Sequence, residues 1–397
     1  MHQLSNRVLN MEESQTIGMA RKTRELAAKG INVIGLTLGE PDFNVPDFIK
    51  SAAIEAVEKD FSHYTPIAGY SDLREAICAK FKRDNGLDYS PNQIVASTGA
   101  KQSIANAVLA LVNPGDEVVI PAPYWVSYTA IVDLAEGKSV FINTTAEQGY
   151  KFTAEQLEAS ITSRTRVLLF SYPCNPSGAV YTDSELEAIA EVIRKHPNVY
   201  VISDEIYELI RFDGKHRSFA SFPGMLERTI TVNGMSKGFA MTGWRLGYLG
   251  APLEIAQACD KLQGQFTSAP NSIAQRAAIR ALQADPAEVK YMVNAFEKRR
   301  KLMFDRLTKI PGFKMSLPGG AFYLFPDISF WLNRTLGGRE IKTSNDLCMY
   351  LLEVAHVGLV SGEAFGSPDS IRISYAASES DLNEAMNRIE KALLPWL

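Results

Sequence analysis

The sequence predicts an α/β protein in which a mostly parallel, seven-stranded sheet is flanked by helices, together with a smaller α+β domain. Short runs rich in Val and Ile alternate with helical patterns over most of the chain, whereas the last third mixes long amphipathic stretches with isolated strands. The runs that we expect to form the large sheet end at Gly, Pro, Asp or Ser, and they span 94–97, 117–120, 139–142, 167–170, 200–202, 229–232 and 246–249.

The segments between many of these strands have a helical pattern, most clearly 101–111 and 183–195. Alternation of strands and helices favours parallel pairing, because each helix carries the chain back across the sheet. The last third begins with a long amphipathic pattern and then alternates strands with helices. We expect helices at 286–310, 345–355 and 379–394, and strands at 319–325, 357–360 and 370–374.

Two domains follow from this pattern. A helix at 11–28 and a short strand at 33–38 precede the large sheet, and we expect them to join the smaller domain. The predicted division is an N-terminal segment at 1–45, a large domain at 46–285 and a small C-terminal domain at 286–397.

Composition and charge exclude several functional classes. The 397 residues carry a formal net charge of -4, which gives no electrostatic basis for binding nucleic acid. The cysteines and histidines are widely scattered, so neither a disulfide framework nor a metal site is predicted. The sequence has no apolar leader and no stretch that approaches the roughly 18–20 apolar residues of a membrane span. We expect a cytoplasmic protein with no membrane partner.

Lys237 is the residue whose surroundings point most directly to chemistry. It follows a predicted strand and lies among small residues, with Ser236 before it and Gly238 after it. Small residues let a bulky cofactor approach the backbone. A lysine amine forms a covalent bond with the aldehyde of pyridoxal phosphate and, once released, acts as a general base. A solvated surface lysine is the ordinary alternative.

Asp204 and Tyr207 come directly after the predicted strand at 200–202. A carboxylate at the C-terminal end of such a strand faces the crevice where open α/β sheets bind ligands. There it could keep a pyridine ring nitrogen protonated, and a protonated ring takes up electrons more readily. Taken alone, Asp204 is about as well explained as a cap of the following turn. The later Ser236-Lys237 pair favours the functional interpretation.

Two features suit a phosphate group. Arg245 lies in a Gly-Trp-Arg context, and its guanidinium matches a phosphate dianion. Gly99 and Ala100 join a predicted strand to a helix, and the free N–H groups at a helix start bind phosphate. A surface arginine and an ordinary strand–helix junction are the alternatives, and the second signal is weak in isolation.

Three further residues lie where they could contact a ligand, and each also has a common structural explanation. Asn175 stands between two prolines after the strand at 167–170, where it could bind a phenolic oxygen or form an Asx turn. Trp125 could stack on a flat ring or pack in the core. Arg372 lies alone on one face of an Ile-Arg-Ile strand, so either a substrate carboxylate or an internal acid would pair with it.

Taken together, these motifs resemble the class I aminotransferases, pyridoxal phosphate enzymes of the aspartate aminotransferase superfamily. The resemblance spans nearly the whole chain and is strongest to the prokaryotic-type aspartate aminotransferase branch. It rests on Gly39-Glu-Pro-Asp-Phe43, Tyr64-Thr-Pro-Ile-Ala-Gly69, Asn175-Pro-Ser-Gly178, Ser203-Asp-Glu-Ile-Tyr207, the segment from Ser236 to Arg245, and Arg372.

The resemblance implies fold type I of the pyridoxal phosphate transferases, with Lys237 as the catalytic residue that holds the cofactor and moves the proton. It implies that Asp204 pairs with the ring nitrogen and that Tyr207 and Asn175 bind the ring's 3-oxygen. Trp125 would stack on the ring. The residues expected around the phosphate are Gly99, Ala100, Ser236 and Arg245, joined by Tyr64 from the neighbouring subunit of a homodimer. Lys101 is also expected among the residues that bind the cofactor.

Substrate binding is implied in the same way. Arg372 would hold the α-carboxylate, assisted by Gly39 and Asn175 and bordered by Trp125. The second carboxylate of a dicarboxylic substrate would be received by Lys101, Ser14 and Thr16. The implied reaction moves an amino group from an L-amino acid, in the first place aspartate, to a 2-oxo acid such as 2-oxoglutarate by a ping-pong mechanism.

Two departures from the family pattern leave alternatives for the substrate. Glu12 and Glu13 precede Ser14 and could weaken a site for a dianion, and Ser361 stands where the family often has proline. The alternatives are the same chemistry on aromatic amino acids, kynurenine, prephenate or alanine and, more distantly, a non-catalytic regulator that binds pyridoxal phosphate. A β-lyase or decarboxylase activity also stays open, because the early steps are shared.

Overall fold

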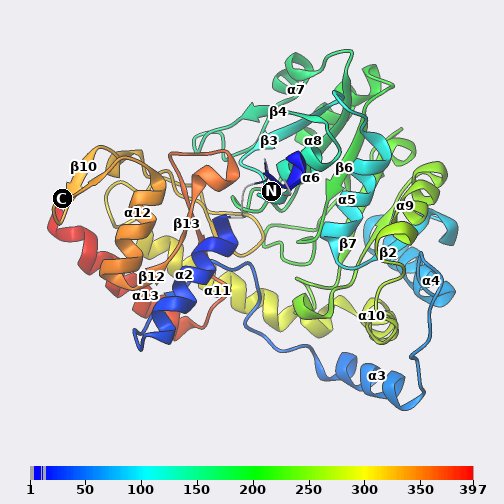
Figure 1. Ribbon diagram of the computed structural model, residues 1–397, viewed down its shortest axis with the longest axis horizontal. Coiled ribbons are helices and arrows are strands. Elements are labelled where there is room, and N and C mark those ends of the chain that lie inside the picture. Colours follow the sequence, from blue (N-terminus) through cyan, green and yellow to red (C-terminus); the bar gives the residue numbers. More distant parts are fainter. Residues whose placement is uncertain (1–3, 10, 12–14, 397) are drawn as a thin grey trace.

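The computed structural model describes residues 4–9, 11 and 15–396, and its elements fall into two groups that lie side by side (Figure 1). The larger group contains the main sheet with its covering helices. The smaller group contains elements from both ends of the chain. The predicted domain boundaries at 45/46 and 285/286 stay a prediction.

The main sheet has seven strands in the order β2-β8-β7-β6-β5-β3-β4. The strands are β2 (Ile94–Ser97), β3 (Glu117–Ala122), β4 (Lys138–Asn143), β5 (Thr165–Ser171), β6 (Tyr200–Asp204), β7 (Thr229–Gly234) and β8 (Gly247–Gly250). Neighbours pair in parallel except that β8 runs antiparallel to both β2 and β7. The mostly parallel α/β sheet predicted from the sequence is confirmed, and each predicted run forms one of these strands.

Helices cover both faces of the sheet because both faces are apolar. Along β5, Val167 and Leu169 belong to one buried cluster, while Leu168 and Phe170 belong to another, as expected when successive side chains alternate across a sheet. The first cluster is completed by α5 (Ala100–Leu111), α6 (Ser127–Leu134) and α9 (Leu253–Phe266). The second is completed by α7 (Ala154–Ser160) and α8 (Asp183–Lys195). Helices α3 (Asp47–Glu58), α4 (Ser71–Lys80) and α10 (Ser272–Gln283) pack together near β2.

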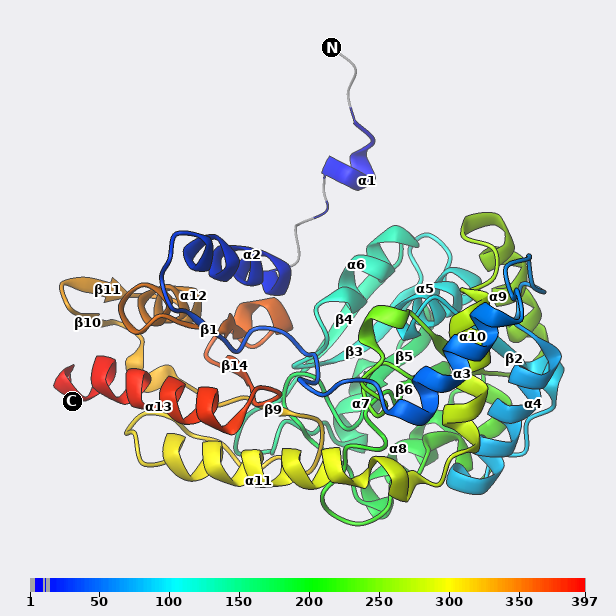
Figure 2. The same ribbon diagram turned by 90° about the horizontal axis from the view of Figure 1, so that it is seen from below.

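The smaller group brings the two ends of the chain together. β1 (Ile34–Gly35) pairs in parallel with β12 (Val357–Gly358), and α2 lies beside α12 in both views (Figures 1 and 2). The other elements of the described chain are α1 (Asn6–Leu9), α2 (Gln15–Ala28), α11 (Lys290–Leu307), β9 (Tyr323–Leu324), β10 (Arg334–Leu336), β11 (Arg339–Ile341), α12 (Ser344–Tyr350), β13 (Val360–Ser361), β14 (Ile371–Ser374) and α13 (Glu379–Leu393).

Some predicted elements are shorter in the structure than the pattern indicated. The strands expected at 319–325 and 33–38 are reduced to the two-residue strands β9 and β1. The reason is that the first apolar run bonds to several separate segments. Ala321 donates its N–H to the carbonyl of Ile210, and Tyr375 donates to Phe322, so no single strand accompanies the run along its length.

The carboxyl ends of the parallel strands place several loops at one edge of the sheet. Ser171 at the end of β5 is paired with Asp204 at the end of β6, and Asp204 is paired with Val232 near the end of β7. The loops that follow meet β9 and β14 of the smaller group. Within the described residues, no helix is both long and apolar enough to cross a membrane.

Candidate active site

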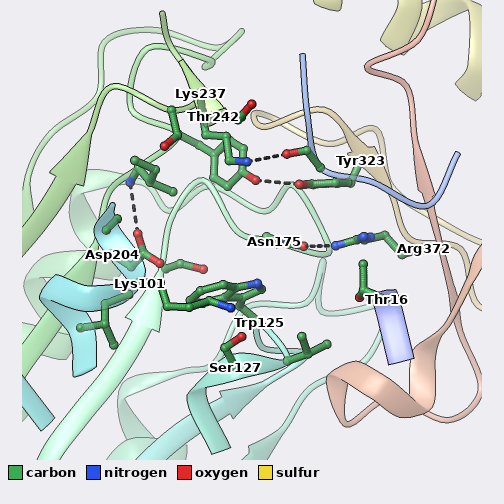
Figure 3. A pocket seen from close by; sticks show the side chains of 18 of the residues that line it. Thr16, Lys101, Trp125, Ser127, Asn175, Asp204, Lys237, Thr242, Tyr323 and Arg372 are labelled. Carbon is green, nitrogen blue, oxygen red and sulfur yellow. Dashed lines mark hydrogen bonds between the residues drawn. The ribbon is translucent and has the colours of Figure 1, made fainter. Parts of the chain in front are cut away.

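A cavity of about 270 Å³ opens at the carboxyl edge of the sheet (Figure 3). Its wall brings together most of the residues that the sequence predicts to be functional: Thr16, Gly39, Ala100, Lys101, Trp125, Asn175, Asp204, Tyr207, Ser236, Lys237, Arg245 and Arg372. Gly99 lies directly behind Arg245. Tyr64 lies outside this cavity and is 99% exposed. Ser14, Glu12 and Glu13 fall outside the described residues.

Lys237 reaches the cavity from the turn after β7, and its amine donates a hydrogen bond to the carbonyl oxygen of Gly39. Burial lowers the pKa of Lys237 to about 8, against the opposing effect of Glu40. A buried amine with this pKa is partly unprotonated near neutral pH, which suits both a nucleophile and a general base.

Asp204 ends β6 with both carboxylate oxygens bound. Oδ2 accepts a hydrogen bond from the hydroxyl of Tyr128 at 2.7 Å, and Oδ1 accepts the N–H of Ile206 at 3.3 Å. Burial raises the pKa of Asp204 to about 6, and the Tyr128 hydrogen bond limits that rise. Asp204 therefore both caps the following turn through Oδ1 and lines the cavity, so the two alternatives considered from the sequence are compatible.

Gly99 and Arg245 form a close contact at the start of α5. A Cβ on Gly99 would lie 2.4 Å from Nη2 of Arg245, and Gly99 has φ +83°, so glycine is required for both reasons. Arg245 itself has φ 56° and bonds to neutral oxygens, with Nη1 2.9 Å from the carbonyl of Thr242. In the part of the chain that the structure describes, it forms no ion pair. The N-terminus of α5 and this guanidinium are together suited to a phosphate.

Arg372 projects from β14 and is fully buried. Nη1 donates to Oδ1 of Asn175 at 2.8 Å, and Nη2 donates to the carbonyl of Thr37. The guanidinium lies between the rings of Tyr323 and Phe365, at 4.6 and 4.8 Å from their centroids. Burial lowers its pKa.

The surroundings of Arg372 decide between the two explanations considered from the sequence. An internal salt bridge would require an acid, and no acid pairs with Arg372 among the described residues. The Nε atom of Arg372 also has no hydrogen-bond partner among those residues. A buried cation in that situation is costly unless a ligand brings the negative charge. The arrangement therefore favours an anionic ligand such as a carboxylate.

The opposite wall of the cavity contains Trp125 and Lys101. The Lys101 amine lies 4.9 Å from the centroid of the Trp125 ring, a favourable cation–π arrangement. Burial, with a smaller effect of Arg245, lowers the pKa of Lys101. Thr16 at the start of α2 also faces the cavity, and its hydroxyl is buried without a partner among the described residues. Lys101 therefore offers a cation to a second anionic group, and Thr16, which Figure 3 shows on the Arg372 side of the cavity, offers a hydroxyl.

The structure adds cavity residues that the sequence pattern did not indicate: Ser127, Thr242 and Tyr323, together with Tyr128 behind Asp204. Tyr128 follows Trp125 by one helical turn at the start of α6, but a tyrosine in an apolar helix ordinarily indicates only packing. Tyr323 lies in the apolar run around β9. Neither has a local signal, because each contacts a partner that is distant in the sequence.

Pyridoxal phosphate fits the residues of this cavity. Lys237 provides an amine for its aldehyde and Asp204 a carboxyl for its ring nitrogen. Arg245, whose guanidinium packs against Gly99, provides a cation for its phosphate. Trp125 provides a flat face. The donor set thus matches each reactive or charged part of the cofactor.

The raised pKa of Asp204 predicts how the cofactor-free protein responds to pH. The folded-state pKa of about 6 is above the ordinary value of 3.8, so the folded protein holds the proton of Asp204 more tightly than the unfolded chain does. The stability that this protonation contributes is fully present below about pH 4 and is lost as the pH rises through about 6. Asp204→Asn stays uncharged. We expect its free energy of unfolding, relative to the wild type, to increase by on the order of 3 kcal/mol between about pH 4 and pH 7. Denaturant unfolding at both pH values measures this, and an equal difference at both would contradict it.

Comparison with known proteins identifies the family. A family model described as aminotransferase class I and II matches residues 31–389. An aspartate aminotransferase of Pinus pinaster is 48% identical, covering 98% of this chain and 81% of its own, and an aspartate/prephenate aminotransferase of Cereibacter sphaeroides is 46% identical, covering 98% of each. The crystal structure of the aspartate aminotransferase from Rhizobium meliloti aligns with a TM-score of 0.95 at 43% identity over 99% of each chain. The chain belongs to the class I and II aminotransferases, as its motifs predicted.

Proposed function

We propose that this protein is a pyridoxal phosphate-dependent aminotransferase that moves the amino group of L-aspartate to 2-oxoglutarate by a ping-pong mechanism. The proposal rests on the observation that Lys237 and Arg372 line the same cavity. Lys237 is an amine of lowered pKa, and Arg372 is a buried guanidinium with no acid partner among the described residues. The names of the relatives, aspartate aminotransferase and aspartate/prephenate aminotransferase, support the same substrate class.

The cofactor, when bound, supplies an aldehyde that joins to amines and a protonated ring that takes up electrons from the substrate. The protein residues do the remaining work. Asp204 holds the ring nitrogen protonated, since a positive charge beside it favours its ionised form. Tyr207 and Asn175 donate to the ring's 3-oxygen. Ser236, Arg245 and the start of α5 bind the phosphate.

Lys237 transfers the proton that the reaction requires. Its Nζ accepts the proton of the substrate α-carbon in one direction and returns a proton in the other. The pKa of about 8 allows both protonation states to be populated near neutral pH. Arg372 holds the α-carboxylate in two parallel hydrogen bonds, which fixes the orientation of the bond to be broken.

The second carboxylate of aspartate is received by Lys101 and Thr16. Lys101 lies against the Trp125 ring on the wall away from Arg372, as the labelled side chains in Figure 3 show. Two cations in one cavity favour a dicarboxylic substrate over an apolar one. Prephenate is the second candidate, because it is also a dicarboxylate and because relatives such as the Cereibacter sphaeroides enzyme include it in their names.

The active unit of this proposal is a homodimer. Tyr64 is 99% exposed and Phe266 is 68% exposed in the single chain, although both are large and largely apolar. Side chains of this kind are enriched where surfaces are covered by a partner. The proposal places Tyr64 of each subunit at the phosphate in the other subunit's cavity.

A panel of amino donors tests the proposed activity. With pyridoxal phosphate bound, aspartate and glutamate should convert the cofactor to its amine form in a single half-reaction, followed by absorbance. Lys237→Ala should slow this conversion by at least about 10²- to 10⁴-fold, because the proton acceptor is removed. Borohydride reduction followed by peptide mapping should label Lys237 in the wild type. If no amino acid converts the cofactor, the protein is not an aminotransferase.

Lys101→Ala tests the recognition of the second carboxylate. We expect kcat/KM for aspartate to fall about 10- to 100-fold, as for the loss of a hydrogen bond to a charged group, while that for alanine stays within about threefold. Lys138→Ala removes an exposed lysine from β4 and serves as the matched control. Steady-state kinetics on both donors measure the effect. Unchanged aspartate kinetics in Lys101→Ala would show that the second carboxylate binds elsewhere.

Mixing two impaired variants tests the shared site. Tyr64→Ala should weaken cofactor binding in the partner's cavity, whereas Lys237→Ala should abolish turnover in the cavity of its own subunit. In a hybrid dimer, one of the two cavities has an intact Lys237 and an intact partner Tyr64. After dissociation and reassembly, an equal mixture should recover about one quarter of wild-type activity, since half of the dimers are hybrids with one intact site. Activity no higher than the mean of the two variants would rule out sharing.

A further inference from the structure

Tyr323 lines the cavity from β9, but it belongs to none of the motifs on which the family resemblance rests. Its side chain is fully buried, and its hydroxyl lies 2.6 Å from the hydroxyl of Tyr207. Its ring covers the guanidinium of Arg372 at 4.6 Å (Figure 3). One side chain therefore contacts both the phenol expected to bind the cofactor and the cation expected to bind the substrate.

Either hydroxyl can donate the Tyr207–Tyr323 hydrogen bond, so its direction depends on which proton a bound ligand engages. Each phenol has a single O–H to donate. In the described part of the chain, the hydroxyl of Tyr323 has one hydrogen-bond partner, Tyr207. Donation by Tyr323 leaves the Tyr207 proton free to point into the cavity, whereas donation by Tyr207 would consume it. A hydroxyl that accepts one hydrogen bond also becomes a stronger donor of its own.

The position of the Tyr323 hydroxyl is tightly confined. A Cβ on Gly39 would lie 1.9 Å from it, so the absence of a side chain at Gly39 makes room for this hydroxyl. The Tyr323 ring packs against Phe322 at 4.9 Å between centroids and edge-on against Tyr207 at 5.8 Å. The side chain is thus held with its hydroxyl at Tyr207 and its face on Arg372.

We propose that Tyr323 is a positioning residue with two separable contributions. Its hydroxyl donates to Tyr207 and directs the Tyr207 proton to the phenolic oxygen of the cofactor. Its ring holds the Arg372 guanidinium in the orientation that receives a carboxylate. This inference rests on the proposed function, because the roles of Tyr207 and Arg372 belong to it.

Tyr323→Phe tests the first contribution, because it removes the hydroxyl and keeps the ring. A weaker hydrogen bond from Tyr207 leaves more negative charge on the phenolic oxygen, and that charge favours protonation of the nitrogen that joins Lys237 to the cofactor. We expect the midpoint of the pH-dependent absorbance of the cofactor-loaded enzyme to rise by about 0.5–1 unit, the effect of one hydrogen bond. The dissociation constant of succinate, an unreactive dicarboxylate, should stay within about twofold of the wild type.

Tyr323→Leu tests the second contribution, because it also removes the ring. The loss of the cation–π contact should weaken succinate binding by about fivefold or more, beyond any change seen in Tyr323→Phe. Titration calorimetry of the cofactor-loaded enzyme measures this binding without turnover.

Tyr375→Phe is the matched control. Tyr375 is also fully buried, and its hydroxyl donates to the carbonyl of Ala321 at 3.1 Å, with no contact to Tyr207 or Arg372 among its hydrogen bonds. It should leave both the absorbance midpoint and succinate binding unchanged. The inference is overturned if Tyr323→Phe has the wild-type midpoint, if Tyr375→Phe shifts the midpoint equally, or if folded Tyr323→Leu binds succinate as tightly as Tyr323→Phe.

These measurements are independent of the proposed activity, since neither requires turnover. A wild type that binds pyridoxal phosphate but fails to convert it with any donor would refute the aminotransferase proposal and leave the Tyr323 results interpretable. A wild type that does not bind the cofactor would overturn both. If Tyr323→Leu does not fold, the absorbance midpoint of Tyr323→Phe still tests the contribution of the hydroxyl. A wild-type midpoint in Tyr323→Phe would then overturn the inference.

Discussion

The cavity depends on a cation that is buried with no acid paired to it among the described residues. The guanidinium of Arg372 is bonded to the side-chain amide of Asn175 and the carbonyl of Thr37, and it is covered by the rings of Tyr323 and Phe365. Neutral oxygens and π faces stabilise a cation only in part, so the carboxylate of a ligand would stabilise it further. An acid in the wall would stabilise the protein more, but it would occupy the place of the ligand's carboxylate.

Burial moves the pKa values of two other groups in opposite directions. Burial lowers the pKa of Lys237 to about 8 and raises that of Asp204 to about 6, so each group shifts toward its uncharged form. Tyr128 limits the shift of Asp204 by donating to it. A cofactor with a positively charged ring nitrogen would restore the ionised form of Asp204. Ligand binding therefore relieves a cost that folding alone leaves in place, which is a common relation between stability and function in active sites.

Sequence patterns predicted which residues line the cavity better than they predicted the contacts that support those residues. Lys237 and Asp204 could be predicted because each stands in a short motif after a Val- and Ile-rich run, and such runs identify the large sheet reliably. Tyr128 and Tyr323 could not, because their partners Asp204 and Tyr207 lie 76 and 116 positions away in the chain. A hydroxyl contact of that kind depends on how two elements pack, and no local pattern encodes it. The two-residue strands were overestimated for a related reason, since their pairing partners come from separate segments.

The two-residue strand β1 positions the segment that follows it, and this segment contacts several residues of the cavity. Within a few residues, it provides the carbonyl of Thr37 to Arg372 and the carbonyl of Gly39 to Lys237, and its Glu40 accepts a hydrogen bond from Thr242. A carbonyl holds the amine in place without the full stabilisation of a carboxylate, while the more distant charge of Glu40 raises the pKa of Lys237 only in part. A carboxylate at Gly39 would add a second negative charge that raises the pKa of Lys237, as Glu40 already does. The neutral acceptor at this position therefore leaves burial as the dominant influence on the pKa of Lys237.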